Sequence, residues 1–182
     1  MSAAPRYSLI ARLFHWGVAA LVLAMIPAGV IMVQEGLPRE TANMLFIFHK
    51  NVGVLVLLVV LARLAYRFFN PAPPLPAGIN PLQKRISHVS HALLYVLLIA
   101  MPILGYTRVK AGGFPIEYLD AMGIPALVPR SEALADAAQT AHFVGGLLLA
   151  ALIAAHVGAA LLHGIILRDG VFRRMWFGTG AH

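Results

Sequence analysis

The sequence of 182 residues contains no cysteine. This absence excludes disulfide frameworks, cysteine-ligated zinc, iron–sulfur clusters and thiol nucleophiles. Charged residues are also scarce, at 12% of the chain against about 25% in soluble domains. Hydrophobic residues make up 60%, and the mean hydropathy is +0.80. The composition excludes a soluble globular enzyme and a disordered chain, and it predicts a membrane protein.

Charge-free segments locate the expected membrane spans. Residues 13–34, 86–107 and 137–167 contain no Asp, Glu, Lys or Arg. Each segment reaches the roughly 20 residues that a helix needs to cross the hydrocarbon core. A fourth segment, 44–69, predicts one more long helix with polar residues near both ends. Those polar residues are His49, Lys50, Asn51, Arg63 and Arg67.

The segments between the spans predict connectors and no second domain. The proline-rich segment 70–81 is expected to be non-helical, and residues 108–136 form the longest expected loop. The sequence shows no internal repeat. We therefore expect one membrane domain over residues 1–182, an all-α bundle of four transmembrane helices.

The basic charge is distributed unevenly across these spans. Four spans place both termini on one side, and that side carries nine basic residues and one acid, a net charge of +8. They are Arg6, Arg12, Arg63, Arg67, Lys84, Arg85, Arg168, Arg173 and Arg174, with Asp169. The other side carries five basic and six acidic residues, a net charge of −1. They are Arg39, Lys50, Arg108, Lys110 and Arg130, with Glu35, Glu40, Glu117, Asp120, Glu132 and Asp136.

Lysine and arginine concentrate on the cytoplasmic side of membrane proteins, so both termini are expected there. The total charge of +7 is then a consequence of membrane orientation, and no nucleic-acid partner is expected. A three-span topology divides lysine and arginine in the same nine-to-five ratio. The charge pattern therefore orients the bundle without establishing the second span.

Four of the eight histidines lie within the expected spans: His15, His49, His142 and His156. His142 and His156 are 14 residues apart on one helix, which corresponds to about 21 Å along the axis and a difference of about 40° around it. They predict two sites stacked across the membrane. By depth, His49 pairs with His142 near the outer surface, and His15 pairs with His156 nearer the cytoplasm. The second pair matches in depth if the first helix begins near Ser8.

Two imidazoles that face each other across a helical bundle can supply both axial ligands of a haem. A flat macrocycle needs small neighbours, and several residues follow the histidines by three or four positions. They are Gly53, Gly145, Gly146, Ala159 and Ala160. The alternatives are that these residues only let helices pack and that the histidines only form interhelical hydrogen bonds. The absence of cysteine argues against an intramembrane zinc site.

The remaining polar residues near the cytoplasmic side allow two interpretations each. His88, His91 and His163 could line a quinone pocket, because quinone carbonyls need hydrogen-bond donors and quinone reduction needs protons; they could also be plain interfacial histidines. Arg63 and Arg67 could pair with haem propionates, or they could only end the second helix and follow the positive-inside rule.

Four segments carry a resemblance to a known family. RLFHW (12–16), FHKNVGVLVLLVVLARL (48–64), SHVSHALLYVLLIAMPILGY (87–106) and AHFVGGLLLAALIAAHVGAALLH (141–163) resemble the bacterial cytochrome b561 family. The resemblance implies a multi-pass cytochrome b of the bacterial cytoplasmic membrane that encloses two b-type haems. It implies that His49 and His142 bind the outer haem, and that His15 and His156 bind the inner haem. The quinone-side histidines of the family match His91 and His163.

The resemblance also implies an activity. Similar members include a superoxide oxidase, which takes an electron from superoxide at the outer face and passes it through both haems to ubiquinone. The outer net charge of −1 does not favour attraction of an anion, although Lys50, Arg108 and Lys110 are local positive charges. The partners expected are membrane lipid, a quinone, and superoxide or a partner redox protein.

Two other function classes stay open. One is a membrane subunit that exchanges electrons with a dehydrogenase or a c-type cytochrome. The other is a haem-free, histidine-lined transporter, which the lack of Asp and Glu within the clear spans disfavours.

Overall fold

The computed structural model describes residues 6–76 and 78–177, and these residues contain helices and loops but no strand. The helices are α1 (Leu9–Ile31), α2 (Arg39–Phe69), α3 (Pro81–Ala111), α4 (Glu117–Ala121) and α5 (Glu132–Leu161). A π-helix (Leu162–Leu167) continues α5, and a short 3-10 helix (Phe172–Arg174) follows it. Within the described part of the chain, four helices are long and apolar enough to cross a membrane. The prediction of an all-α fold with four long apolar helices is confirmed.

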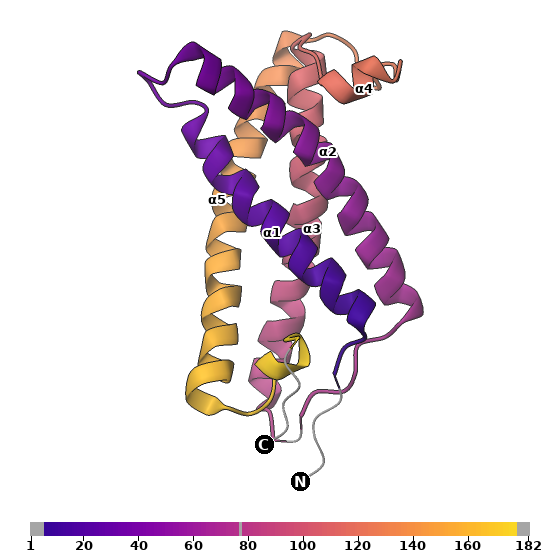
Figure 1. Cartoon of the computed structure of the whole chain (residues 1–182), viewed down its shortest axis with the longest axis vertical. Coiled ribbons are helices and arrows are strands. Elements are labelled where there is room, and N and C mark those ends of the chain that lie inside the picture. The colour runs from indigo at the N-terminus through magenta and orange to yellow at the C-terminus, as the bar shows by residue number, and fades with distance from the viewer. Residues whose placement is uncertain (1–5, 77, 178–182) are drawn as a thin grey trace.

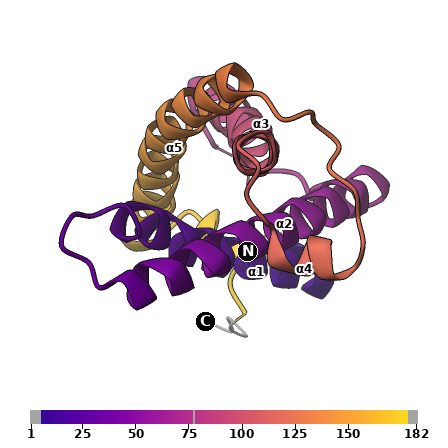
Figure 2. The same ribbon diagram turned by 90° about the horizontal axis from the view of Figure 1, so that it is seen from above.

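The four long helices form two crossed layers (Figure 1). Helix α1 packs against α2, α2 against α3, and α3 against α5, whereas α1 and α5 do not form a closely packed pair. Seen from above, α1 and α2 lie on one side of the molecule and α3 and α5 on the other (Figure 2). Side chains of all four helices therefore meet between the layers, among them Val18, Val56, Leu94 and Leu149.

The helix ends follow ordinary capping chemistry. Ser8 caps α1 by accepting a hydrogen bond from the Ala11 amide, so α1 begins early enough for the depth match proposed for His15. Asn80 caps α3, and Pro81 occupies the first helical position, where its missing N–H costs nothing. The non-helical connector therefore ends one residue earlier than predicted.

The predicted loop 108–136 is shorter than expected and partly helical. Helix α3 continues through Ala111, and α5 begins at Glu132 after the cap Ser131. Between them, Glu117–Ala121 forms the five-residue helix α4. Charged residues in this stretch mark the water-exposed ends of the helices, so the charge-free segments underestimated the helix lengths.

An aliphatic layer occupies the centre of the bundle. It consists of Val18, Val22, Val56, Val60, Leu94, Leu98 and Leu149, which are all buried. Most other large apolar side chains on the long helices are exposed, as expected for helices that face lipid. The layer lies on each helix between the two depths at which polar residues occur.

The described ends of the chain lie together at the end of the bundle opposite α4 (Figure 1). Residues 168–177, here called the return segment, fold back across this end. The Tyr7 amide donates to the Arg174 carbonyl at 3.2 Å, and the Trp16 indole donates to the Met175 carbonyl at 2.9 Å. Buried Arg174 donates to the carbonyl of Pro73 in the connector. The return segment thus ties α1 to the segment between α2 and α3.

Candidate functional site

The structure brings the expected outer pair of histidines together. The ring centroids of His49 on α2 and His142 on α5 are 6.1 Å apart, with 75° between the ring planes. The Nδ1 atom of His142 lies 3.1 Å from the Met101 carbonyl, which assigns the proton to Nδ1 and leaves Nε2 with a free lone pair. The buried Nδ1 of His49 has no hydrogen-bond partner among the described residues.

Two glycines that the sequence analysis missed lie against these rings. A Cβ atom on Gly29 of α1 would come within 2.8 Å of Cε1 of His49, and one on Gly105 of α3 would come within 3.2 Å of Cε1 of His142. Both glycines belong to helices other than that of the histidine they contact. Each ring therefore lies so close to its neighbouring glycine that the Cβ of an alanine there would contact the ring.

The inner histidines are also brought together. The ring centroids of His15 on α1 and His156 on α5 are 6.2 Å apart, with 67° between the planes. The ring of His91 on α3 is 5.3 Å from that of His156. The guanidinium of Arg63 on α2 donates from Nη2 to Nδ1 of His15 at 3.0 Å. Three imidazoles and one arginine therefore converge at this depth.

The residues that meet around the outer histidine pair and those that meet around the inner pair have the same spacing along the helices. On every long helix, a residue of the first group and a residue of the second are 14 positions apart. We call Gly29, His49, Gly105 and His142 the outer level, and His15, Arg63, His91 and His156 the inner level. An interval of 14 residues is close to four helical turns, so each helix presents both residues toward the centre of the bundle. This spacing is the signal that could have identified the two glycines.

The small residues expected beside the ligands have a different role. A Cβ atom on Gly145 or Gly146 would meet Met101 of α3, and one on Gly53 would meet Met25 of α1. These glycines allow neighbouring helices to approach each other, which was the alternative interpretation. Ala159 is exposed on the surface of α5 and Ala160 is partly exposed.

The three cytoplasmic-side histidines occupy different positions. His91 is fixed by a hydrogen bond from Nδ1 to the Ser87 carbonyl at 2.6 Å. His163 lies in the π-helix and donates from Nδ1 to Asp169 at 2.5 Å. No hydrogen bond or ring contact joins His91 to His163 within the described residues, and His88 is exposed. His182 lies outside the described residues.

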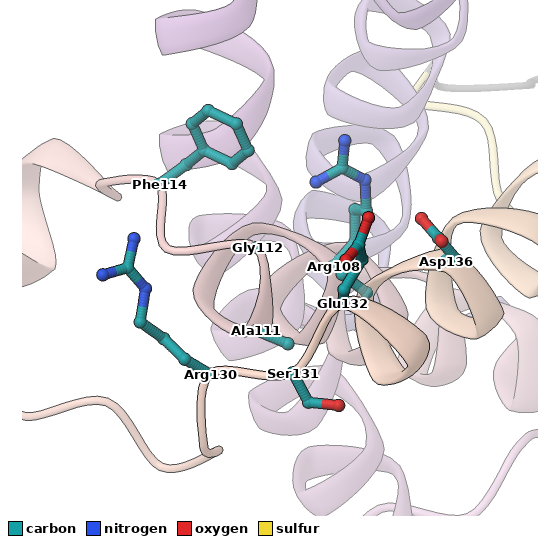
Figure 3. Close-up of a pocket in the computed structure, with 9 residues that line it drawn as sticks. Arg108, Ala111, Gly112, Phe114, Arg130, Ser131, Glu132 and Asp136 are labelled. Atoms are coloured by element: carbon teal, nitrogen blue, oxygen red, sulfur yellow. The ribbon is translucent and has the colours of Figure 1, made fainter.

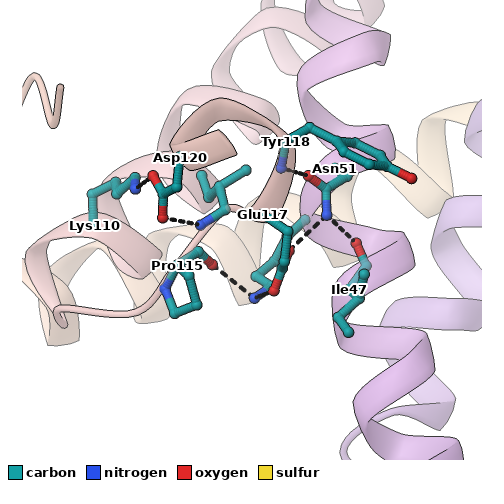
Figure 4. Close-up of polar contacts among 9 residues, drawn as sticks. Ile47, Asn51, Lys110, Pro115, Glu117, Tyr118 and Asp120 are labelled. Carbon is teal, nitrogen blue, oxygen red and sulfur yellow. Dashed lines mark hydrogen bonds and ion pairs between the residues drawn. The ribbon is translucent and has the colours of Figure 1, made fainter. Parts of the chain in front are cut away.

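The outer surface is organised by α4, which polar contacts hold against α2 (Figure 4). Lys50 donates to Glu117 at 2.5 Å and to the Pro115 carbonyl at 2.7 Å. Asn51 donates to Glu117 and accepts from the Tyr118 amide. Partial burial of Glu117 opposes ionisation, but hydrogen bonds from Lys50, its own backbone and Asn51 outweigh it and hold the pKa of the carboxyl below its ordinary value.

A second ion pair repeats this arrangement on α3. Lys110 pairs with Asp120, and this hydrogen bond holds the pKa of the Asp120 carboxyl below its usual value. Two of the three positive charges expected near the outer site, Lys50 and Lys110, are therefore neutralised by acids of α4. The third, Arg108, donates to Gln139 at 2.8 Å and lies over the ring of Phe114.

An open pocket of about 460 Å³ lies beside Arg108, where α3 ends and α5 begins. Figure 3 shows Arg108, Glu132 and Asp136 on one side of it and Arg130 and Phe114 on the other. Its two arginines are balanced by two carboxylates, so the pocket has no net charge preference. It is separate from the histidine pairs.

Membrane helices that pair partly buried histidines across a bundle, at two depths, have the architecture of a membrane haem protein. The comparisons with known proteins are consistent with this class. The chain belongs to the prokaryotic cytochrome b561 family, whose sequence model matches residues 6–178. Proteins of this family are membrane electron-transfer proteins that carry b-type haem, and the chain is a multi-pass protein of the bacterial inner membrane.

Individual relatives cover almost the whole chain. It is 32% identical over 175 residues to "Cytochrome b561 homolog 2" of Escherichia coli (strain K12), covering 93% of this chain and 90% of that protein. It is 28% identical over 174 residues to "Probable superoxide oxidase CybB" of Yersinia pestis, covering 93% and 95%. It is also 28% identical over 176 residues to "Cytochrome b561 homolog 1" of Escherichia coli (strain K12), covering 93% and 96%.

The residues present fit a b-type haem. The ring centroids of the two pairs are 6.2 and 6.1 Å apart, so the two imidazoles of each pair are close enough that both could bind one metal ion. Two imidazole rings in direct edge-to-face contact have similar centroid distances, so the distance alone does not distinguish such a contact from a shared metal ion. The residues around the rings make this distinction. The absence of side chains at Gly29 and Gly105, next to the rings of His49 and His142, favours a flat ligand at the outer level.

Proposed function

We propose that this chain is a di-haem cytochrome b that transfers electrons from a donor at the outer face to ubiquinone near the cytoplasmic face, with superoxide as the donor. The observation that carries the proposal is the pair of levels related by 14 residues on every long helix. His49 and His142 hold the outer haem, and His15 and His156 hold the inner haem. Bound there, haem supplies one-electron redox chemistry.

The chain's own residues orient the ligands and exclude water. The Met101 carbonyl fixes the His142 ring with Nε2 free, which is the tautomer that can bind a metal. The aliphatic layer separates the two levels with side chains that cannot carry protons. His91 and His163 are the proposed quinone-site residues, and the bonds to Ser87 and Asp169 leave Nε2 of each ring available.

The proposed orientation places both termini in the cytoplasm. The end of the bundle with the return segment carries the net charge of +8, and the end with α4 carries −1. The positive-inside rule therefore supports a cytoplasmic location for the inner level and for the quinone site. The whole chain then forms a single integral-membrane cytochrome b domain.

Superoxide as the donor is supported by the relative described as a probable superoxide oxidase. A specific observation favours a second candidate, a partner redox protein that docks at the outer face. Lys50 and Lys110 are paired with Glu117 and Asp120, so they do not present free positive charge to an anion. A protein donor does not need such attraction.

Purified protein in liposomes tests both the haem and the donor. Reduced-minus-oxidised spectra should show two b-type haems per chain, His142→Ala should lose one, and His88→Ala, an exposed histidine, should lose none. Ubiquinone reduction that requires only a superoxide source would support the self-contained enzyme. Two haems without this activity would support the partner-protein function, and a colourless protein would overturn both.

A further inference from the structure

Three hydrogen-bond donors lie close together beside the inner level: the Tyr95 hydroxyl and the guanidinium groups of Arg63 and Arg67. The buried hydroxyl of Tyr95 on α3 has no hydrogen-bond partner among the described residues. The guanidinium carbon of Arg63 lies 5.4 Å from the centroid of the Tyr95 ring, and that of Arg67 lies 5.8 Å from it. Both arginines come from the last turns of α2, so two positive charges lie against the ring that carries the unpaired hydroxyl.

No acid pairs with these charges among the residues that the structure describes. Among the described residues on this side of the bundle, Asp169 is the single acid, and its carboxylate already accepts from His163 and from the Val171 amide. Arg67 makes no hydrogen bond or ion pair with any described residue, and Arg63 makes one hydrogen bond, to His15. Buried unpaired donors are costly, and such groups in native proteins generally have a partner.

The hydrogen bond from Arg63 to His15 indicates that Arg63 needs another acceptor when a haem is bound. Arginine is always protonated and can only donate, so Nδ1 of His15 accepts and the neutral ring carries its proton on Nε2. Binding of a metal at Nε2 requires the proton to be on Nδ1, as assigned for His142 at the outer level. When His15 serves as a ligand, Arg63 therefore needs a different acceptor.

We propose that Arg63, Arg67 and the Tyr95 hydroxyl form a binding site for an anionic oxygen, and that its occupant is a propionate carboxylate of the inner haem. This inference rests on the proposed function, because it requires a haem at the inner level. A lipid phosphate has the same charge and acceptor chemistry and is the other source of such an oxygen. Such a site should bind a propionate more strongly than its neutral ester, because the ester has weaker hydrogen-bond acceptors and no charge.

Haem-depleted protein reconstituted with haem or with haem dimethyl ester tests the site. Wild-type protein should retain haem at the inner level roughly 10- to 100-fold more strongly than the diester, since hydrogen bonds to charged groups are strong. Tyr95→Phe and Arg67→Gln should each reduce this preference several-fold. Arg85→Gln, an exposed arginine on the same side, and Tyr118→Phe, an exposed tyrosine, should leave it unchanged.

A second measurement separates this role from a structural one. If the Tyr95 hydroxyl serves only the ligand, Tyr95→Phe should leave the melting temperature of the haem-depleted protein unchanged or raise it, while it weakens haem retention. Equal retention of haem and diester by wild-type protein would overturn the propionate site but not the proposed function. Equal retention of haem and diester, together with anionic-lipid binding that Arg67→Gln weakens, would identify a lipid phosphate and overturn the propionate assignment. Failure of His15→Ala to remove a haem would overturn both.

Discussion

The substitution Gly29→Ala tests whether the outer level holds a ligand between His49 and His142. A Cβ at position 29 would lie 2.8 Å from Cε1, 3.3 Å from Nδ1 and 3.7 Å from Nε2 of His49. Contacts below about 3 Å between such atoms are repulsive, so the ring or α1 must move. The side chain of His49 moves more easily than the helix α1, so we expect the His49 ring to turn away from His142.

Overpacking of this kind typically costs about 1–3 kcal/mol. The same energy, applied to the position of one axial ligand, corresponds to a loss of roughly 5- to 150-fold in affinity for the outer haem. Gly17→Ala is a matched control on the same helix, because a Cβ there would meet nothing within 4 Å. Gly17→Ala should therefore be neutral.

The assay is the haem content per chain, from reduced-minus-oxidised spectra, after prolonged detergent washing at graded free-haem concentrations. We expect Gly29→Ala to lose the outer haem first and Gly17→Ala to match the wild type. Gly105→Ala, with a contact of 3.2 Å to His142, should give an intermediate loss. Full haem retention by Gly29→Ala, with an unchanged spectrum, would refute the assignment of His49 as a ligand.

Three further predictions concern the two ends of the bundle. Glu117→Gln should destabilise the attachment of α4 by about 1–3 kcal/mol, because Lys50 loses its charged partner. Protease cleavage between residues 112 and 131 should therefore become faster. The substitution Glu132→Gln, at an exposed position, is the control and should not change the cleavage rate. Because the pKa of Glu117 lies below its ordinary value of 4.5, its ionised form stabilises the attachment above that pH and the stability should fall as the pH drops further; cleavage in Glu117→Gln should lack this acid dependence. Trp16→Phe should loosen the return segment by about 1 kcal/mol through loss of the bond to the Met175 carbonyl, detectable as faster hydrogen exchange at residues 172–177, and unchanged exchange would contradict this role.

The sequence was sufficient to predict the long helices and both histidine pairs. Charge-free segments and the interval from His142 to His156 required only helix geometry, because both residues lie on one helix. The match of His15 to His156 also followed once α1 began at Leu9, next to its cap Ser8. These features depend on periodicity along a single chain segment.

The contacts between helices could not be predicted in the same way. Gly29 and Gly105 matter because of rings on other helices, and the crossing of two helix layers decides which rings those are. The bond from Arg63 to His15 joins residues 48 positions apart. Helix α4 has only five residues, too few for a hydrophobic period, and it is held by Lys50 and Asn51 of α2.

The aliphatic layer between the levels makes the proposed reaction sensitive to voltage. Its residues cannot carry protons, so an electron would cross it as a bare charge. The levels are about 21 Å apart along α5, roughly two-thirds of a 30 Å hydrocarbon core. With about 2.3 kcal/mol per charge per 100 mV across the whole membrane, inward transfer costs about 1.6 kcal/mol per electron at an inside-negative potential of 100 mV. Quinone reduction in liposomes should therefore slow as an inside-negative potential is imposed, and an unchanged rate would mean that the two levels lie at one electrical depth.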